Sequence, residues 1–188
     1  MANITIHPRR SEDLEACLEV LQKVYKDSGY PVNGPSLPFL QGPQTLVSWV
    51  ATIPCPDSSQ PSSNHRVVGH IALATATDTD VAVNLWRSQN RPEPVFVLQR
   101  LFVDPAAQGQ GIAEGLIRAV VDEGRRRGGS VVLFALIKDQ VAMRLYEKLA
   151  WTEFGTAIFG EGKGEGVEKE AVCYVAPDER SRQGSEEQ

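Results

Sequence analysis

The chain has 188 residues, of which 41% are hydrophobic and 23% charged, and its net charge is −5. This length fits one globular domain, which we place at 1–176, followed by a polar tail at 177–188 that we expect to be disordered. The negative charge argues against nucleic acid and acidic membrane surfaces as partners, since both need a basic face. Three widely spaced cysteines predict neither a disulfide framework nor a zinc site, and no export signal or long apolar run stands out. We therefore expect a cytoplasmic protein without a membrane span.

Hydrophobic periodicity predicts alternating strands and helices. Period-two alternation or continuous apolar runs mark the strands, whereas apolar residues three and four apart mark the helices. Ser11 is the expected N-cap of the first helix. In chain order we expect a strand at 3–7, a helix at 11–26, strands at 45–53 and 66–75, a short helix at 81–88, a strand at 95–103, a helix from 112 to the glycines at 128–129, a strand at 130–137, a helix at 140–150, and strands at 152–159 and 168–175.

The order of these elements predicts an α/β fold on a mixed sheet. The strand–helix–strand arrangement across 95–137 requires a right-handed crossover and therefore a parallel pair. The segments 45–75 and 152–175 read as hairpins, with an exposed, mobile tip at 54–65 and a turn-rich link at 160–166. We expect a mostly antiparallel central sheet with one parallel pair, flanked by helices, in which the strand at 95–103 is covered on both faces.

Three glycines, Gly109, Gly111 and Gly115, open the helix that follows the central strand. Each costs about 1 kcal/mol relative to alanine inside a helix, so they need another reason to be there. A helix that starts after a buried strand presents unpaired N–H groups suited to a phosphate, and glycine leaves them uncovered. Glycine also serves a tight turn or close packing of a helix on a sheet, and both interpretations stay open. Glu114 breaks the dinucleotide-binding fingerprint, and no P-loop motif is present.

The segment LFVDPAAQGQGIAEGLI resembles the coenzyme-binding motif of the GNAT superfamily of N-acetyltransferases. That motif reads Gln or Arg, two residues, Gly, one residue, then Gly or Ala, and here it runs from Gln108 to Ala113. The later segment AMRLYEKLAW is similar to the family's Ala-x-x-Leu-Tyr-x-x-x-Gly-Phe, with Ala150 and Trp151 replacing the last two residues. The elements from Arg66 to Phe159 follow the family's order. The resemblance implies a GNAT-like acyl-CoA N-acyltransferase fold.

The resemblance also implies acetyl-coenzyme A as cosubstrate, and nothing in the sequence requires a metal. Main-chain groups of the central strand would meet the pantetheine arm, and N–H groups of the glycine loop would meet the pyrophosphate. The implied coenzyme-binding residues are Leu101, Phe102, Val103, Gln108, Gly109, Gln110, Gly111, Ile112, Ala113 and Asp139. Gln108 either contacts the phosphate or braces the loop. Asp139 stands where the family commonly has asparagine, and serving as the N-cap of the next helix is the more ordinary role for it.

Acetyl transfer to an amine needs a deprotonated amine, a donor for the tetrahedral oxyanion, and a proton for the departing thiolate. The resemblance places Tyr146 as the general acid, because a phenol is protonated at neutral pH. The alternative is a packing role for Tyr146, which follows Leu145 on the apolar stripe of its helix. A strand N–H near Val103 would stabilise the oxyanion.

The general base is not identified, because the central strand lacks the glutamate that some members of the family carry there. Candidates are His70, Glu93, or a water held by Gln99 or by a backbone carbonyl. A single histidine on a strand is more often a hydrogen-bonded wall residue than a base. An acceptor amine with a lowered pKa would need no dedicated base.

The acceptor is expected to be a primary amine of a small molecule, a peptide or a lysine side chain. The resemblance implies an acceptor site at the loop after the first helix and at the last hairpin, joined by Trp86 from the insert before the central strand. Aromatic and apolar side chains there either bind an apolar part of the acceptor or only seal the edge of the core. The candidates are Tyr30, Pro31, Phe39, Trp86 and Phe159.

Two other classes of function stay open. One is an acetyl-coenzyme A sensor or interaction module with little or no transferase activity, and the other is an unrelated nucleotide-binding domain. We expect a monomer or a homodimer.

Overall fold

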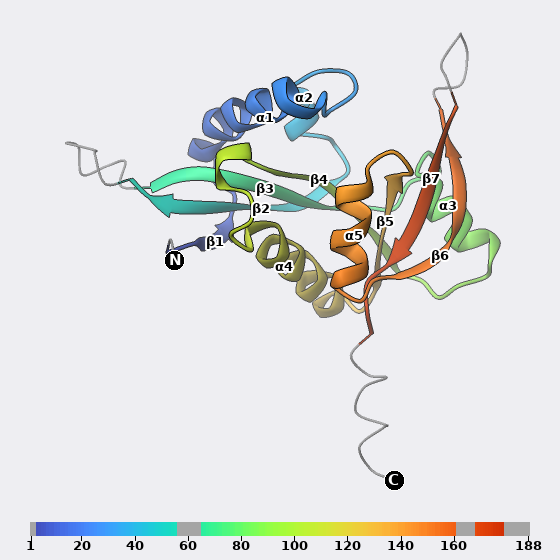
Figure 1. The fold of residues 1–188 in the computed structure, drawn as a ribbon. Coiled ribbons are helices and arrows are strands. Elements are labelled where there is room, and N and C mark those ends of the chain that lie inside the picture. The colour runs from blue at the N-terminus through green and yellow to red at the C-terminus, as the bar shows by residue number, and fades with distance from the viewer. Residues whose placement is uncertain (1–2, 56–64, 161–167, 179–188) are drawn as a thin grey trace. The chain divides into compact units, whose positions relative to one another are not determined.

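Figure 1 shows the fold as a computed structural model, in which residues 3–55, 65–160 and 168–178 are described. The predicted mobile tip, the turn-rich link and the predicted disordered tail fall mostly on 56–64, 161–167 and 179–188, outside the described residues.

Seven strands form one sheet in the order β1-β2-β3-β4-β5-β7-β6. The parallel pair joins β4 to β5 through Val95–Val97 and Ser130–Val132, whereas β1–β2, β2–β3, β5–β7 and β6–β7 are antiparallel. The strands are β1 (Thr5–Pro8), β2 (Thr45–Pro54), β3 (His65–Thr75), β4 (Val95–Val103), β5 (Ser130–Leu136), β6 (Thr152–Phe159) and β7 (Lys169–Val175). The predicted mixed α/β sheet with one parallel crossover pair is confirmed.

Five α-helices and two short 3₁₀ turns complete the described residues. They are η1 (Ser11–Asp13), α1 (Leu14–Ser28), α2 (Leu37–Leu40), α3 (Val81–Ser88), η2 (Pro105–Ala107), α4 (Ile112–Arg126) and α5 (Gln140–Lys148). The prediction that Ser11 caps the first helix is wrong, because Ser11 lies inside η1. Asp13 instead accepts a hydrogen bond from the backbone N–H of Arg10 at 2.7 Å.

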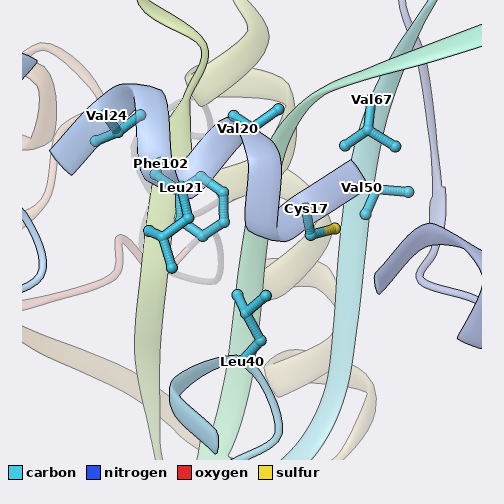
Figure 2. Close-up of a cluster of buried hydrophobic side chains, with 8 residues drawn as sticks. All are labelled: Cys17, Val20, Leu21, Val24, Leu40, Val50, Val67 and Phe102. Carbon is cyan, nitrogen blue, oxygen red and sulfur yellow. The ribbon is translucent and has the colours of Figure 1, made fainter. Parts of the chain in front are cut away.

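The chain divides into two compact units, and each is described by itself. The first comprises Met1–Thr75 and Leu98–Arg127. Helix α1 lies on one face of its strands and α4 on the other (Figure 1). Figure 2 shows the cluster beneath α1 and α2, where side chains from both helices meet β2, β3 and β4. Its buried members are Cys17, Val20, Leu21, Val24, Leu40, Val50, Val67 and Phe102.

The second unit comprises Ala76–Val97 and Gly128–Gln188. Trp86 of α3 packs with Phe154 and Cys173 in the core of this unit. Tyr174 follows Cys173 on β7, and consecutive strand residues point to opposite faces of a sheet. Tyr174 packs against Tyr146 of α5, so α3 and α5 cover opposite faces of the strands in this unit.

Candidate functional site

The turn between β4 and α4 is anchored by a buried carboxylate. Asp104 is 2% exposed, and its backbone N–H donates to the carbonyl of Val68 on β3 at 2.8 Å. Its Oδ1 accepts from the N–H of Ala106 at 3.0 Å, and its Oδ2 lies 3.2 Å from Lys23 Nζ and 3.6 Å from Arg66 Nη1. This carboxylate fixes where the chain leaves the strand. Sequence reasoning gave it no role, although an Asp-Pro pair before a turn is a typical cap signal.

Two of the three glycines adopt the left-handed backbone conformation. The φ angle is 76° at Gly109 and 79° at Gly111, and Gly111 is the N-cap of α4. A Cβ atom built on either glycine would meet no heavy atom within 4 Å. Because the first N–H groups of a helix have no partner within it, this open loop presents backbone donors without side chains over them. The arrangement fits a phosphate group.

Gly115 has a different role. A Cβ atom there would lie 2.5 Å from Cδ1 of Ile6 on β1, so its missing side chain lets α4 pack closely on the sheet. The close-packing interpretation therefore holds for Gly115, whereas phosphate binding at Gly109 and Gly111 stays a prediction. Gln108 and Gln110 are exposed on the loop, whereas Ile112 is buried and offers a ligand only its backbone.

Strand β4 departs from regular geometry just before this turn. Arg100 has a φ of 56°, which is rare for a residue with a side chain. Phe102 is 4% exposed and packs in the core beneath α1, whereas Gln99, Leu101 and Val103 are half-buried. The expectation that the whole strand is covered on both faces is therefore met only in part, because these three side chains stay half-buried.

His70 lies in the wall of the first unit with no exposed surface. Its Nδ1 is 3.0 Å from the carbonyl oxygen of Arg100, its Nε2 is 3.2 Å from Arg9 Nη1, and its ring stacks on Phe102 at 5.1 Å. Burial, reinforced by the positive charges of Arg9 and Arg100, lowers the pKa of His70 to about 4 although the hydrogen bond to Arg100 opposes the shift. The imidazole is therefore neutral near pH 7. These contacts favour the wall-residue interpretation over that of a general base.

Tyr30, from the loop after α1, and Phe39, from α2, come together edge to face with ring centroids 5.8 Å apart. The guanidinium carbon of Arg100 lies 5.5 Å from the Phe39 ring centre, and Arg100 Nη1 donates to Thr45 Oγ1 at 2.7 Å. Pro31 is buried. Helix α2 therefore packs over β4 at Arg100, the residue with the left-handed backbone.

Tyr146 lies in the second unit and is 6% exposed. Its ring packs against Trp151 at 5.5 Å and Tyr174 at 5.9 Å. Trp151 is buried. Ala150, which precedes Trp151, has a φ of 59°. Glycine adopts this conformation freely, which explains why the pattern that this segment resembles has glycine at the position of Ala150.

The remaining candidates of the second unit make structural contacts. Trp86 is 3% exposed and donates its indole N–H to the carbonyl of Pro92 at 2.9 Å. Glu93 accepts from the N–H of Val95 at 2.9 Å and from Arg87 Nε at 2.9 Å. Phe159 stacks on Phe134 at 5.0 Å.

Asp139 occupies the N-cap position of α5, but its carboxylate makes no capping hydrogen bond. The side chain is exposed. The expected position is therefore observed, and the expected capping bond is not.

Across the described part of the chain, no three His, Cys, Asp or Glu side chains are grouped so as to hold a metal ion. None of the described helices is long and apolar enough to cross a membrane.

The chain matches a known protein family. Residues 49–151 match the family model described as Acetyltransferase (GNAT) family. A comparison with curated protein sequences gave no match.

Solved structures resemble the fold over nearly its whole length. Arabidopsis thaliana NAA60 in complex with acetyl-CoA has a TM-score of 0.65 at 20% identity, with 92% of this chain and 97% of that chain covered. The ribosomal-protein-S18-alanine N-acetyltransferase of Escherichia coli has a TM-score of 0.60 at 18% identity, with 93% of each chain covered. The putative acetyltransferase yncA of Salmonella typhimurium with its cofactor acetyl-CoA has a TM-score of 0.61 at 17% identity, with 92% of each covered. The family model spans more than half of the chain, and this protein belongs to the GNAT family of acetyltransferases.

Proposed function

We propose that the protein transfers the acetyl group of acetyl-coenzyme A to a primary amine by direct attack through a tetrahedral intermediate. The observation that carries the proposal is the left-handed pair Gly109 and Gly111 at the start of α4, which leaves backbone donors uncovered directly after β4. A pyrophosphate is the kind of anion that such a helix start accepts. Family membership and the acetyl-CoA named with two of the neighbours support the choice of ligand.

The chain's own groups divide the work in this proposal. The N–H groups from Gly109 to Ala113 hold the pyrophosphate, and the main chain of Leu101–Val103 lies along the pantetheine arm. An N–H near Val103 stabilises the oxyanion. Tyr146 donates a proton to the departing thiolate, because a phenol with a reference pKa of about 10 is protonated at neutral pH.

No side chain of the described residues is assigned as general base. His70 is neutral, and the contacts of its ring with Arg9 and Arg100 favour the tautomer in which Nε2 carries no proton and faces Arg9. Glu93 is bound to Arg87 and to the N–H of Val95. We infer that the amine loses its proton to water. The rate is then expected to rise with pH toward the pKa of the acceptor amine.

The acceptor is proposed to be a small molecule or a peptide that carries the amine beside an apolar group. The aromatic pair Tyr30 and Phe39 supports an apolar contact. The name of the E. coli neighbour gives an alanine of a ribosomal protein as its acceptor, and a peptide terminus is therefore one class to screen. We also propose that residues 1–176 act together as one acetyltransferase domain. Cytoplasmic location and a monomeric or homodimeric state stay predictions.

Titration calorimetry with acetyl-coenzyme A tests the proposal, with ATP and NAD as competing ligands. Gly111→Trp places an indole over the loop, and we expect it to abolish binding. Gly128→Trp is the matched control, because Gly128 also has a left-handed φ of 76° with nothing within 4 Å of a built Cβ, and it follows the other end of α4. Equal binding by both variants would refute the site, and a preference for ATP or NAD would support the unrelated nucleotide-binding function.

Turnover separates an enzyme from a sensor. We expect Tyr146→Phe to keep the affinity for acetyl-coenzyme A and to lower kcat by about 100-fold, the smaller end of what a general acid contributes. Tight binding without any transfer across a panel of amines and peptides would favour the sensor, and transfer that persists in Tyr146→Phe would refute the general-acid role of Tyr146.

A further inference from the structure

Strand β4 contains a backbone conformation that its own sequence does not favour. Arg100 is left-handed at a φ of 56° in the middle of the strand, immediately before the residues proposed to meet the pantetheine arm. A side-chain-bearing residue stays in this region only when its surroundings hold it there.

The main-chain oxygen of Arg100 is held by the imidazole of His70, 3.0 Å from Nδ1. The contact of the other ring nitrogen determines the tautomer of His70, because Nε2 lies 3.2 Å from Arg9 Nη1. A guanidinium has donors only, so Nε2 must accept and carries no proton. The proton of the neutral ring is therefore on Nδ1 and is donated to the Arg100 carbonyl.

Arg9 is itself fixed, because the same Nη1 donates to the carbonyl of Leu40 at 2.8 Å. On the ring's face, Phe102 stacks at 5.1 Å with an interplanar angle of 16°. His70 therefore contacts the residues on both sides of Leu101, through a hydrogen bond to Arg100 and a ring contact with Phe102. Together with the completely buried position of His70, these contacts restrain the strand at Arg100.

We propose that His70 is a positioning residue for acyl transfer, which fixes the main chain of Leu101–Val103 through its bond to the Arg100 carbonyl. Arg9 sets the tautomer that makes this bond. The inference rests on the proposed function for its catalytic consequence, but the restraint itself concerns the free protein. It also differs from a base role, since a base needs an accessible lone pair and here that lone pair faces a guanidinium.

Two substitutions separate the hydrogen bond from the volume of the ring. His70→Asn keeps an amide donor near the place of Nδ1, whereas His70→Phe keeps the ring that packs on Phe102 and removes the donor. We expect His70→Phe to lower kcat/KM for acetyl-coenzyme A at least tenfold, and His70→Asn to stay within about threefold of the wild type with an unchanged pH profile above pH 6. Equal losses in both variants, or none in His70→Phe, would overturn the proposal.

Two NMR measurements test the restraint without any activity. In the free wild-type protein, long-range ¹H–¹⁵N spectra of His70 should show the proton on Nδ1, and a proton on Nε2 would overturn the assignment. The amide resonances of Leu101, Phe102 and Val103 should move in His70→Phe and stay near their wild-type positions in His70→Asn. If the wild-type protein fails to bind acetyl-coenzyme A, the proposed function is refuted. The two NMR measurements then still decide whether His70 restrains the main chain of Leu101–Val103.

Discussion

At the scale of single residues, the buried imidazole of His70 couples the stability of the fold to pH. Its folded pKa of about 4 lies below the ordinary value of 6.5, so the unfolded chain binds the proton more readily. The stabilising contribution is complete above pH 6.5 and is lost as the pH falls toward 4. Linkage gives a loss of about 2–3 kcal/mol at pH 4.5, because each tenfold difference in proton affinity between the two states corresponds to about 1.4 kcal/mol.

Urea unfolding at pH 7 and pH 4.5, in the wild type and in His70→Asn, measures this loss. From pH 7 to pH 4.5, we expect the free energy of unfolding to fall by about 2–3 kcal/mol more in the wild type than in His70→Asn. Acidic side chains also titrate in acid, and hydrogen bonds from Arg126 and Arg127 help lower the pKa of Glu123 to about 2. Such groups are common to both proteins and cancel in the difference. Identical losses in the two proteins would show that His70 is not buried and neutral.

At the scale of elements, the packing of α4 on β1 depends on the pair Gly115 and Ile6. Alanine at position 115 would strengthen the helix by about 1 kcal/mol, but its Cβ would lie 2.5 Å from Ile6 Cδ1. Ile6→Val deletes that atom. We therefore expect Gly115→Ala to be more favourable in the Ile6→Val background than in the wild type, by about 0.5–1 kcal/mol, which is a typical coupling for residues in contact.

A double-mutant cycle by chemical denaturation checks this coupling. Gly124 lies on the same helix, so Gly124→Ala combined with Ile6→Val serves as a control in which the two changes should add. Additivity of Gly115→Ala and Ile6→Val would contradict the close approach of the helix to the strand.

The elements themselves were largely predictable, because periodicity reports which side of an element is buried. The short helix α3 at Val81–Ser88 and the strand β4 at Val95–Val103 agree with their predicted ranges. Helix α2 was not predicted, since Gly and Pro dominate the surrounding loop. It forms because Ser36 Oγ accepts from the N–H of Phe39 at 3.3 Å and Pro38 stands at its start, where its missing N–H costs little.

The site could be predicted only where local sequence determines it. The left-handed glycines follow from residue type, because few other residues adopt that conformation at low cost. The left-handed Arg100 does not follow, since its conformation depends on His70, 30 residues away, and on Arg9, 61 residues from His70. Such long-range contacts leave no periodic signal.

At the scale of the whole molecule, two compact units with separate cores raise the question of whether unfolding is one transition. Agreement between calorimetric and van't Hoff enthalpies tests this directly. The number of transitions must be known before a ligand-induced shift is converted into a free energy.

Binding of acetyl-coenzyme A should raise the unfolding temperature, because a ligand that binds only the native state stabilises it. At a concentration 100 times the dissociation constant the gain is about 2.7 kcal/mol, which corresponds to a rise of roughly 5–10 °C for a chain of this size. Differential scanning calorimetry measures the shift, and ATP and NAD at the same concentration should produce none. Gly111→Trp should remove the shift and Gly128→Trp should keep it. A shift that persists in Gly111→Trp would place the coenzyme away from the glycine-opened start of α4.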